Sequence, residues 1–312
     1  MEEPGNDGEE SRDVTFYFLS DIHLADGDPN HENTTDPDQL HRFLHYIRDT
    51  PDTKCVIAGD AFELWQANFK KIYSAHHDLV EDLLDLVEKE KVVYTIGNHD
   101  GEIATDMLLY YDGPADIQKI TGLLKDEYHD GYGFESLGAR QIEVVHGDIW
   151  DKWNHGPLEW VGRGIAYIGG LVEKAGWYDV EKYFGKVQRF LKKWGNKPTP
   201  GGSEYVGDYQ EYIDGALDWV QRYGEDVVIY GHTHNPRILH YDAKGEKLLE
   251  EIKDYNVPID VSKDKWIANT GSQVNGATDV LVLRNNVLTL KKLEDVLPEG
   301  YREGDEAPSP DY

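Results

Sequence analysis

Five short, largely apolar runs in this chain each end abruptly in acidic, amide or imidazole side chains. A short continuous apolar run is typical of a buried strand, and open α/β folds bind ligands just beyond the carboxyl ends of their strands. Runs 16–19, 55–58, 92–96, 142–145 and 227–230 lead respectively to Asp21 and His23, to Asp60, to Asn98 and His99, to His146, and to His232 and His234. The pattern predicts an α/β fold with these side chains gathered at one sheet edge.

Asp21 and His23 stand two residues apart, and side chains two apart in an extended segment project to the same side. A carboxylate and an imidazole so placed could bind one ion. A single pair of this kind also fits a solvated strand end, since loops are mostly polar. Recurrence at five strand ends, four of them beside a glycine that permits close backbone approach, favours a shared site.

The motifs appear in the order D-x-H, G-D, G-N-H-D, H-G-D and G-H-T-H. As an ordered set they resemble the signature of the calcineurin-like metallophosphoesterase family over about residues 14–290. The resemblance implies a four-layer α/β/β/α sandwich, in which two sheets pack face to face with helices outside. Later alternating runs at 237–241, 265–269, 280–284 and 287–293, with Asn285-Asn286 as a tight turn, would complete the second sheet.

The resemblance also implies a site with two metal ions. One ion would be bound by Asp21, His23, Asp60 and His234, and the other by Asp60 as a bridge, Asn98, His146 and His232. His99 is implied as the proton donor to the substrate, with Asp100 orienting its ring. A structural role for His99 remains the alternative.

Mixed nitrogen and oxygen ligands suit transition metals better than Ca²⁺ or Mg²⁺, which prefer oxygen. We expect two divalent transition-metal ions, Mn²⁺ first, with Fe, Zn or Ni also suited. Two such ions can activate water and stabilise the attacking and leaving oxygens at phosphorus. The expected activity is therefore hydrolysis of phosphate esters or pyrophosphates, with monoester, diester and pyrophosphate left open.

Two alternatives accompany this expectation. The layout is most similar to the UDP-2,3-diacylglucosamine pyrophosphohydrolase branch of the family, although that branch typically has arginine where this chain has His99. Some members of the fold have lost ligands and serve as non-catalytic scaffolds, but all seven implied ligands are present here.

Acidic residues outnumber basic ones 60 to 31, which gives a formal net charge of −29. This charge disfavours nucleic acid as a partner and hence a nuclease, so a small phosphate ester or a nucleotide-linked substrate is expected. The single cysteine, Cys55, excludes an intrachain disulfide, and residues 1–13 do not read as a signal peptide, so a cytoplasmic location is expected. The charged segments 1–13 and 299–312 are expected to be disordered tails.

Residues 149–225 exceed what one crossover needs and are rich in aromatic residues, glycine and, at 180–194, basic residues. We expect a helical cap inserted over the metal site, with simple packing on the sheet as the alternative. Its most apolar stretch, 160–172, is too short and glycine-rich to span a bilayer. Peripheral membrane contact through the cap remains open, as does the oligomeric state.

Asp36-Pro37 predicts a helix start between the first two strands, and apolar positions follow at helical spacing. His41 and His45 lie four residues apart on this helix, which is a spacing that suits a metal ion. The sequence suggests no third ligand nearby, so we expect a solvated helix face here.

Overall fold

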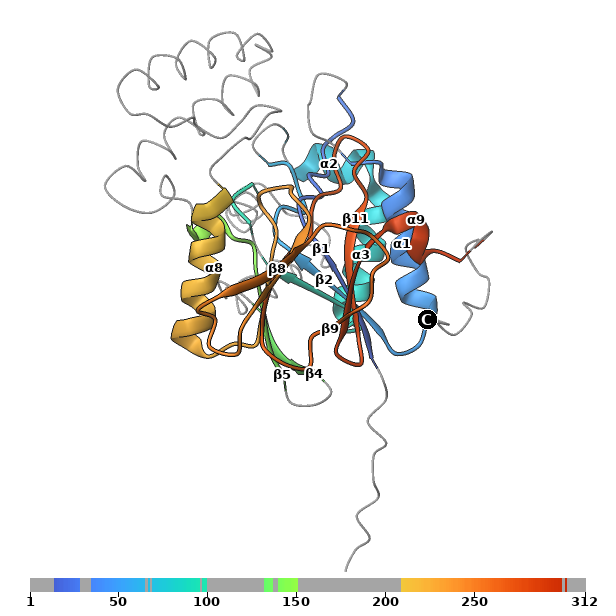
Figure 1. Ribbon diagram of the computed structural model, residues 1–312. Coiled ribbons are helices and arrows are strands. Elements are labelled where there is room, and N and C mark those ends of the chain that lie inside the picture. Colours follow the sequence, from blue (N-terminus) through green and yellow to red (C-terminus); the bar gives the residue numbers. More distant parts are fainter. Residues whose placement is uncertain are drawn as a thin grey trace, which may run out of the picture.

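The computed structural model describes residues 14–28, 35–64, 67, 69–95, 97–99, 132–136, 140–150, 209–298 and 301. Within them, two six-stranded sheets lie face to face between helices (Figure 1).

The first sheet has the strand order β3-β2-β1-β11-β12-β9. Its strands are β1 (Thr15–Leu19), β2 (Thr53–Ala58), β3 (Val92–Thr95), β11 (Asp279–Arg284), β12 (Val287–Lys292) and β9 (Ile259–Asp260). The first three are parallel to one another, while β11 joins β1 antiparallel. The carboxyl ends of β1, β2 and β3 therefore lie at one edge.

The second sheet has the order β4-β5-β6-β10-β7-β8. It consists of β4 (Tyr132–Ser136), β5 (Arg140–Val145), β6 (Val227–Tyr230), β10 (Lys265–Asn269), β7 (Arg237–Tyr241) and β8 (Leu248–Ile252). Strands β5, β6 and β10 are parallel, so a second set of carboxyl ends shares one edge. The sequence did not predict β4, β8 or β9. β8 is an edge strand with mostly exposed side chains, so it lacks the alternation of buried and exposed positions that marks a strand.

Helices cover the outer faces of both sheets (Figure 1). Those on the first sheet are α1 (Pro37–Asp49), α2 (Phe69–Ala75), α3 (His77–Glu88) and α9 (Leu293–Val296), and α8 (Tyr209–Tyr223) covers the second. A short 3₁₀ helix, η1, spans Asp148–Trp150. The predicted start of α1 is confirmed, because Asp36 accepts hydrogen bonds from the backbone of Asp38 and Gln39, with proline in the first turn.

Three apolar cores separate these layers. Between the sheets, Phe18 and Val56 of the first face Ile229 and Trp266 of the second within one buried cluster. A larger cluster joins the first sheet to its helices, and a smaller one joins the second sheet to α8. The predicted four-layer α/β/β/α sandwich is confirmed. The prediction that runs 280–284 and 287–293 complete the second sheet is wrong, because β11 pairs with β1 and thereby places β11 and β12 in the first sheet. Runs 237–241 and 265–269 do lie in the second sheet, as β7 and β10.

The expected cap at 149–225 lies mostly outside the described residues. Its final part is α8, whose Ala216 and Val220 share a buried cluster with Ile267 of the second sheet. This part of the segment is therefore a layer of the sandwich. None of the helices in the described part of the chain has the length and apolar character needed to cross a bilayer.

The two predicted tails also lie outside the described residues, apart from Tyr301. This residue is not loose: its hydroxyl donates a hydrogen bond to Asp49 at 3.0 Å, and its ring packs against Tyr46. The predicted turn at Asn285 and Asn286 is confirmed, since both have positive φ angles of 51° and 61° and join β11 to β12.

Glu143 on β5 generates a pH-dependent prediction. Burial, followed by the nearby charge of Glu225, raises the pKa of Glu143 to about 7 from 4.5. The unfolded chain releases this proton near its usual pKa of 4.5, whereas the folded chain holds it until about pH 7. The stability contributed by the protonated form is therefore fully present below pH 4.5 and is lost as pH rises through 7. We expect Glu143→Gln to raise the free energy of unfolding at about pH 8 by ~1 kcal/mol more than at about pH 5, allowing for partial solvent exposure.

Urea unfolding at the two pH values measures this difference. Glu250→Gln on β8 is the matched control, because Glu250 is exposed. Equal effects of Glu143→Gln at both pH values would show that its carboxyl group does not retain its proton in the native state.

Candidate metal centre

The predicted site residues come together where the strand ends of the two sheets meet. Loops after β1 and β2 carry Asp21, His23 and Asp60, and loops after β5 and β6 carry His146, His232 and His234. Backbone hydrogen bonds tie neighbouring loops together, including one from His23 N to Asp60 O at 2.9 Å. The conformation of each loop is thus stabilised by hydrogen bonds to its neighbour.

Five of these residues have left-handed backbone conformations. The φ angles are 51° at Asp21, 48° at His23, 54° at Asp60, 65° at His232 and 51° at His234. Such values are uncommon for residues other than glycine and cost about 1–3 kcal/mol each, so they persist only where surrounding structure imposes them. They cluster here because each strand must turn sharply while its side chain points into the same space.

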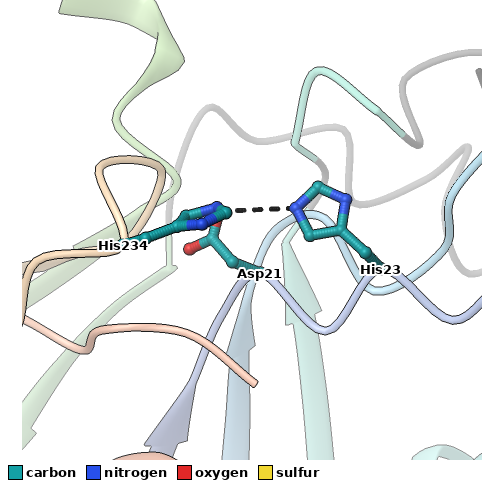
Figure 2. Close-up of side chains that lie close together, drawn as sticks. All are labelled: Asp21, His23 and His234. Carbon is teal, nitrogen blue, oxygen red and sulfur yellow. Dashed lines mark hydrogen bonds and ion pairs between the residues drawn. The ribbon is translucent and has the colours of Figure 1, made fainter. Parts of the chain in front are cut away.

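Asp21, His23 and His234 form a first group of donor atoms. The Nε2 atom of His234 lies 3.1 Å from Oδ1 of Asp21, and Nε2 of His23 lies 3.9 Å from the same oxygen. Figure 2 shows the three side chains converging from the loop after β1 and the loop after β6. One donor atom from each lies within 4.8 Å of the others, which is close enough to share an ion.

Asp60, His146 and His232 form a second group. Nε2 of His146 lies 3.1 Å from Oδ2 of Asp60 and 3.2 Å from Nδ1 of His232. Asn98 joins this group, because its Oδ1 atom lies 3.2 Å from the same Nε2. The second predicted ligand set is therefore gathered around one position.

Asp60 lies between the two groups. Its Oδ2 atom is 3.1 Å from Nε2 of His146 in the second group and 3.8 Å from Nε2 of His23 in the first. A carboxylate that faces one imidazole of each group occupies the position expected of a bridge.

The donor set fits divalent transition metals. Nε2 of His23 is buried without a hydrogen-bond partner in the described structure, although two carboxylate oxygens lie within 4 Å. The other ring nitrogen of His23 donates to Glu63 at 3.0 Å, and Nδ1 of His146 donates to the carbonyl of Ala58 at 2.8 Å. Both rings thus present Nε2 to the site, as metal-ligating histidines do when an outer partner fixes the tautomer.

The buried carboxylates of the site favour positive charge on two of the neighbouring rings. Burial opposes charging of His23, but Asp21, Glu63 and Asp60 raise the pKa of its ring to about 10. Asp60 likewise raises the pKa of His146 well above its usual value despite burial. Burial and the charge of His146 lower the pKa of His232 to about 3. The site is electrically suited to cations, which would displace these protons.

Glu63 is a site residue that the sequence analysis missed. Its Oε2 atom accepts hydrogen bonds from Nδ1 of His23 at 3.0 Å and from Nδ1 of His99 at 2.8 Å. Despite burial, these rings, His99 first, lower the pKa of Glu63 to about 2, so it stays ionised. The available signal was its position three residues after Asp60 in the same loop.

His99 borders the site and bonds Glu63 through its ring, and one of its ring nitrogens lies within 4.8 Å of donor atoms of His23 and Asp60. The backbone N–H of His99 donates to Oδ1 of Asp60 at 2.8 Å, and its side chain is one-fifth exposed. With Nδ1 bonded to Glu63, Nε2 is the ring nitrogen that can meet a ligand at the site. Asp100 lies outside the described residues, and its predicted role stays a prediction.

Residues at the end of β10 form hydrogen bonds with the loops that follow β1 and β6. Ser20 donates a hydrogen bond to Oδ2 of Asp21, which also accepts one from the backbone N–H of His232 at 2.8 Å. Asn269 donates to the carbonyl of Gly231 at 2.7 Å and Thr270 is bonded to Ser20. The Oδ2 atom of Asp21 is thus held by donors from the loops after β1 and β6.

The family model for calcineurin-like phosphoesterases matches residues 14–236. A curated UDP-2,3-diacylglucosamine hydrolase of Vibrio atlanticus (strain LGP32) is 25% identical over 244 residues, which cover 73% of this chain and 83% of that protein.

Similar solved structures include a metallophosphoesterase from Sphaerobacter thermophilus, with a TM-score of 0.45 and 13% identity over 90% of this chain and 88% of that one. Another is the purple acid phosphatase PPD1 from yellow lupin (Lupinus luteus), with a TM-score of 0.40 and 14% identity over 90% of this chain and 52% of that one.

Gly97 packs directly against Asp60 and leaves no room for a larger side chain. A Cβ atom at this position would lie 2.2 Å from Oδ1 and 2.6 Å from the backbone nitrogen of Asp60, so Asp60 would have to move. We expect Gly97→Ala to weaken Mn²⁺ binding by more than about tenfold, since misplacing a ligand costs at least as much as losing an outer partner. Isothermal titration measures the affinity.

Gly276→Ala is the control for a strained substitution away from the site: its φ of 79° disfavours alanine, but a Cβ atom there meets nothing within 4 Å, so Mn²⁺ affinity should be unchanged. Normal Mn²⁺ affinity in Gly97→Ala would show that the loop carrying Asp60 can shift without weakening metal binding.

Proposed function

Because this chain belongs to the calcineurin-like phosphoesterase family of phosphoester hydrolases, we propose that it hydrolyses small phosphate esters or pyrophosphates with two divalent metal ions. The observation that carries the proposal is the position of Asp60, whose Oδ2 atom faces His23 in one donor group and His146 in the other. Mixed imidazole, amide and carboxylate donors favour Mn²⁺, with Fe, Zn or Ni as further candidates.

The proposed ligands divide into two sets that share one carboxylate. Asp21, His23, Asp60 and His234 would bind one ion, and Asp60, Asn98, His146 and His232 the other. When bound, two such ions polarise a phosphoryl oxygen and supply hydroxide at neutral pH. The charge of the buried carboxylates, held ionised by the surrounding rings, provides the affinity.

The protein's own contribution to the reaction is orientation and proton transfer. Glu63 fixes His99 through Nδ1, so Nε2 would be the proton-carrying atom. A protonated His99 would donate to the leaving oxygen as the bond to phosphorus breaks. Because the same Glu63 oxygen holds His23, one carboxylate sets the relative positions of a ligand and the acid.

A second, narrower candidate is a nucleotide-linked pyrophosphate. The similarity to the Vibrio atlanticus UDP-2,3-diacylglucosamine hydrolase favours it. His99 argues for a related but different ester, since that branch typically has arginine at this position. The net charge of −29 disfavours nucleic acid as a substrate.

Hydrolysis of p-nitrophenyl phosphate, its bis ester and a UDP-sugar pyrophosphate by Mn²⁺-loaded protein tests the proposal. We expect turnover of at least one that EDTA abolishes and Mn²⁺ restores, because the ions supply both the nucleophile and the charge stabilisation. The preferred substrate identifies the bond class. No turnover on all three with two ions bound per chain would instead favour a non-catalytic scaffold.

Substitutions separate the role of His99 from that of the ligands. We expect His99→Ala to lower kcat by about 10²–10⁴-fold while both ions remain bound, since it removes only the acid. Asp60→Ala should lose metal and activity together, because it removes the shared ligand. Metal analysis and steady-state kinetics on the same preparations measure both effects.

Glu63→Gln provides an intermediate case, because the amide retains an oxygen that can accept the hydrogen bond from Nδ1 of His99 but loses the charge-assisted character of that bond. Its kcat should fall less than that of His99→Ala. Equal loss of metal in His99→Ala and Asp60→Ala would show that His99 is a ligand.

A further inference from the structure

A second cluster of metal-binding side chains lies on the helices outside the first sheet. It consists of His41 and His45 on α1 and Asp82 on α3. We propose that these three residues form a separate mononuclear site for a divalent transition metal that joins α1 to α3. The site is independent of the proposed hydrolytic function.

The geometry brings the three donors to one point. Nε2 of His41 and Nε2 of His45 each lie 2.5 Å from the same oxygen, Oδ2 of Asp82. The two rings stand on successive turns of α1 with their centroids 4.3 Å apart. The three donor atoms lie within 4.8 Å of one another, as in the groups at the sheet edge.

The expectation of a solvated face at His41 and His45 is therefore wrong. His45 is only 6% exposed, and Asp82 is the third ligand that the sequence did not reveal. Asp82 lies 37 residues beyond His45 and is brought to it only by the packing of α1 against α3. Two imidazoles at i and i+4 with a carboxylate from a second helix is an arrangement that binds metal in helical proteins.

Arg48 and Asp49 support the site from outside. Arg48 lies 3.5 Å from Oδ1 of Asp82, which directs the other oxygen toward the rings. The guanidinium would repel a cation, but Asp49 accepts hydrogen bonds from it at 3.0 and 3.5 Å and offsets its charge. A carboxylate ligand held by an outer partner is typical of protein metal sites.

The donor chemistry selects the ion class. Two imidazoles and one carboxylate suit Zn²⁺, Co²⁺ or Ni²⁺ and disfavour Ca²⁺ and Mg²⁺. Three protein ligands leave a position for water, and the side chain of His41, at 30% exposed, opens the site to solvent. A bound ion would stabilise the folded chain by mass action. The stabilised element would be α1, which joins β1 to β2. These two strands lead into the loops that carry Asp21 and Asp60.

The test measures Co²⁺ in protein that carries His23→Gln, Asp60→Asn and His146→Gln, which remove ligands from both donor groups at the sheet edge. We expect one tightly bound Co²⁺ per chain with a visible absorption band of imidazole-ligated Co²⁺. Adding His41→Gln and His45→Gln should abolish both, because glutamine keeps a hydrogen-bond donor toward Asp82 but cannot replace the imidazole ligand. Zn²⁺ should raise Tm in the first protein and not in the second.

His77→Gln on α3 is the matched control, since this exposed histidine also bonds an aspartate, Asp78, and should leave the Co²⁺ count unchanged. Asp82→Asn, which retains an acceptor for both rings, provides a second variant if the glutamine protein fails to fold, and it should lower Co²⁺ affinity by more than about tenfold. Equal Co²⁺ binding with and without these substitutions, or none in the starting protein, would overturn the proposal and leave a hydrogen-bonded clasp between the helices.

Discussion

The burial of carboxylates and imidazoles in one small volume is the constraint on which the structure depends. Asp21, Asp60 and Glu63 are almost fully buried, and burying a charge is costly unless an opposite charge or a hydrogen bond compensates it. Histidines provide that compensation in every case. Strained loop conformations and close glycine contacts persist because they keep these groups paired.

The scaffold contributes by bringing distant segments to one edge. Parallel strands place their carboxyl ends together, and the face-to-face packing of two such sheets joins both edges into one site. Asp21 and His234 are separated by 213 residues yet lie in hydrogen-bonding distance. A rigid core beneath loops that are bonded to one another is a common basis for precise metal geometry.

The same chemistry recurs on the outside of the first sheet. There α1 and α3, rather than strand ends, hold two imidazoles against Asp82. Since α1 connects β1 to β2, the helix that carries this cluster also spans the strands that present Asp21 and Asp60. An ion at the helices would therefore support the sheet edge through the chain itself.

The sequence by itself determined the α/β class, the order of the motifs and most of the residues that meet at the sheet edge, because apolar runs ending in polar residues are local signals. The four layers followed from the family resemblance that those motifs carry. The sequence even placed the start of α1 and the Asn285-Asn286 turn. Only the tertiary structure revealed that Glu63 bonds both His23 and His99, and that Asp82 completes the pair on α1. These contacts join residues that no spacing rule relates, since they depend on how whole strands and helices pack.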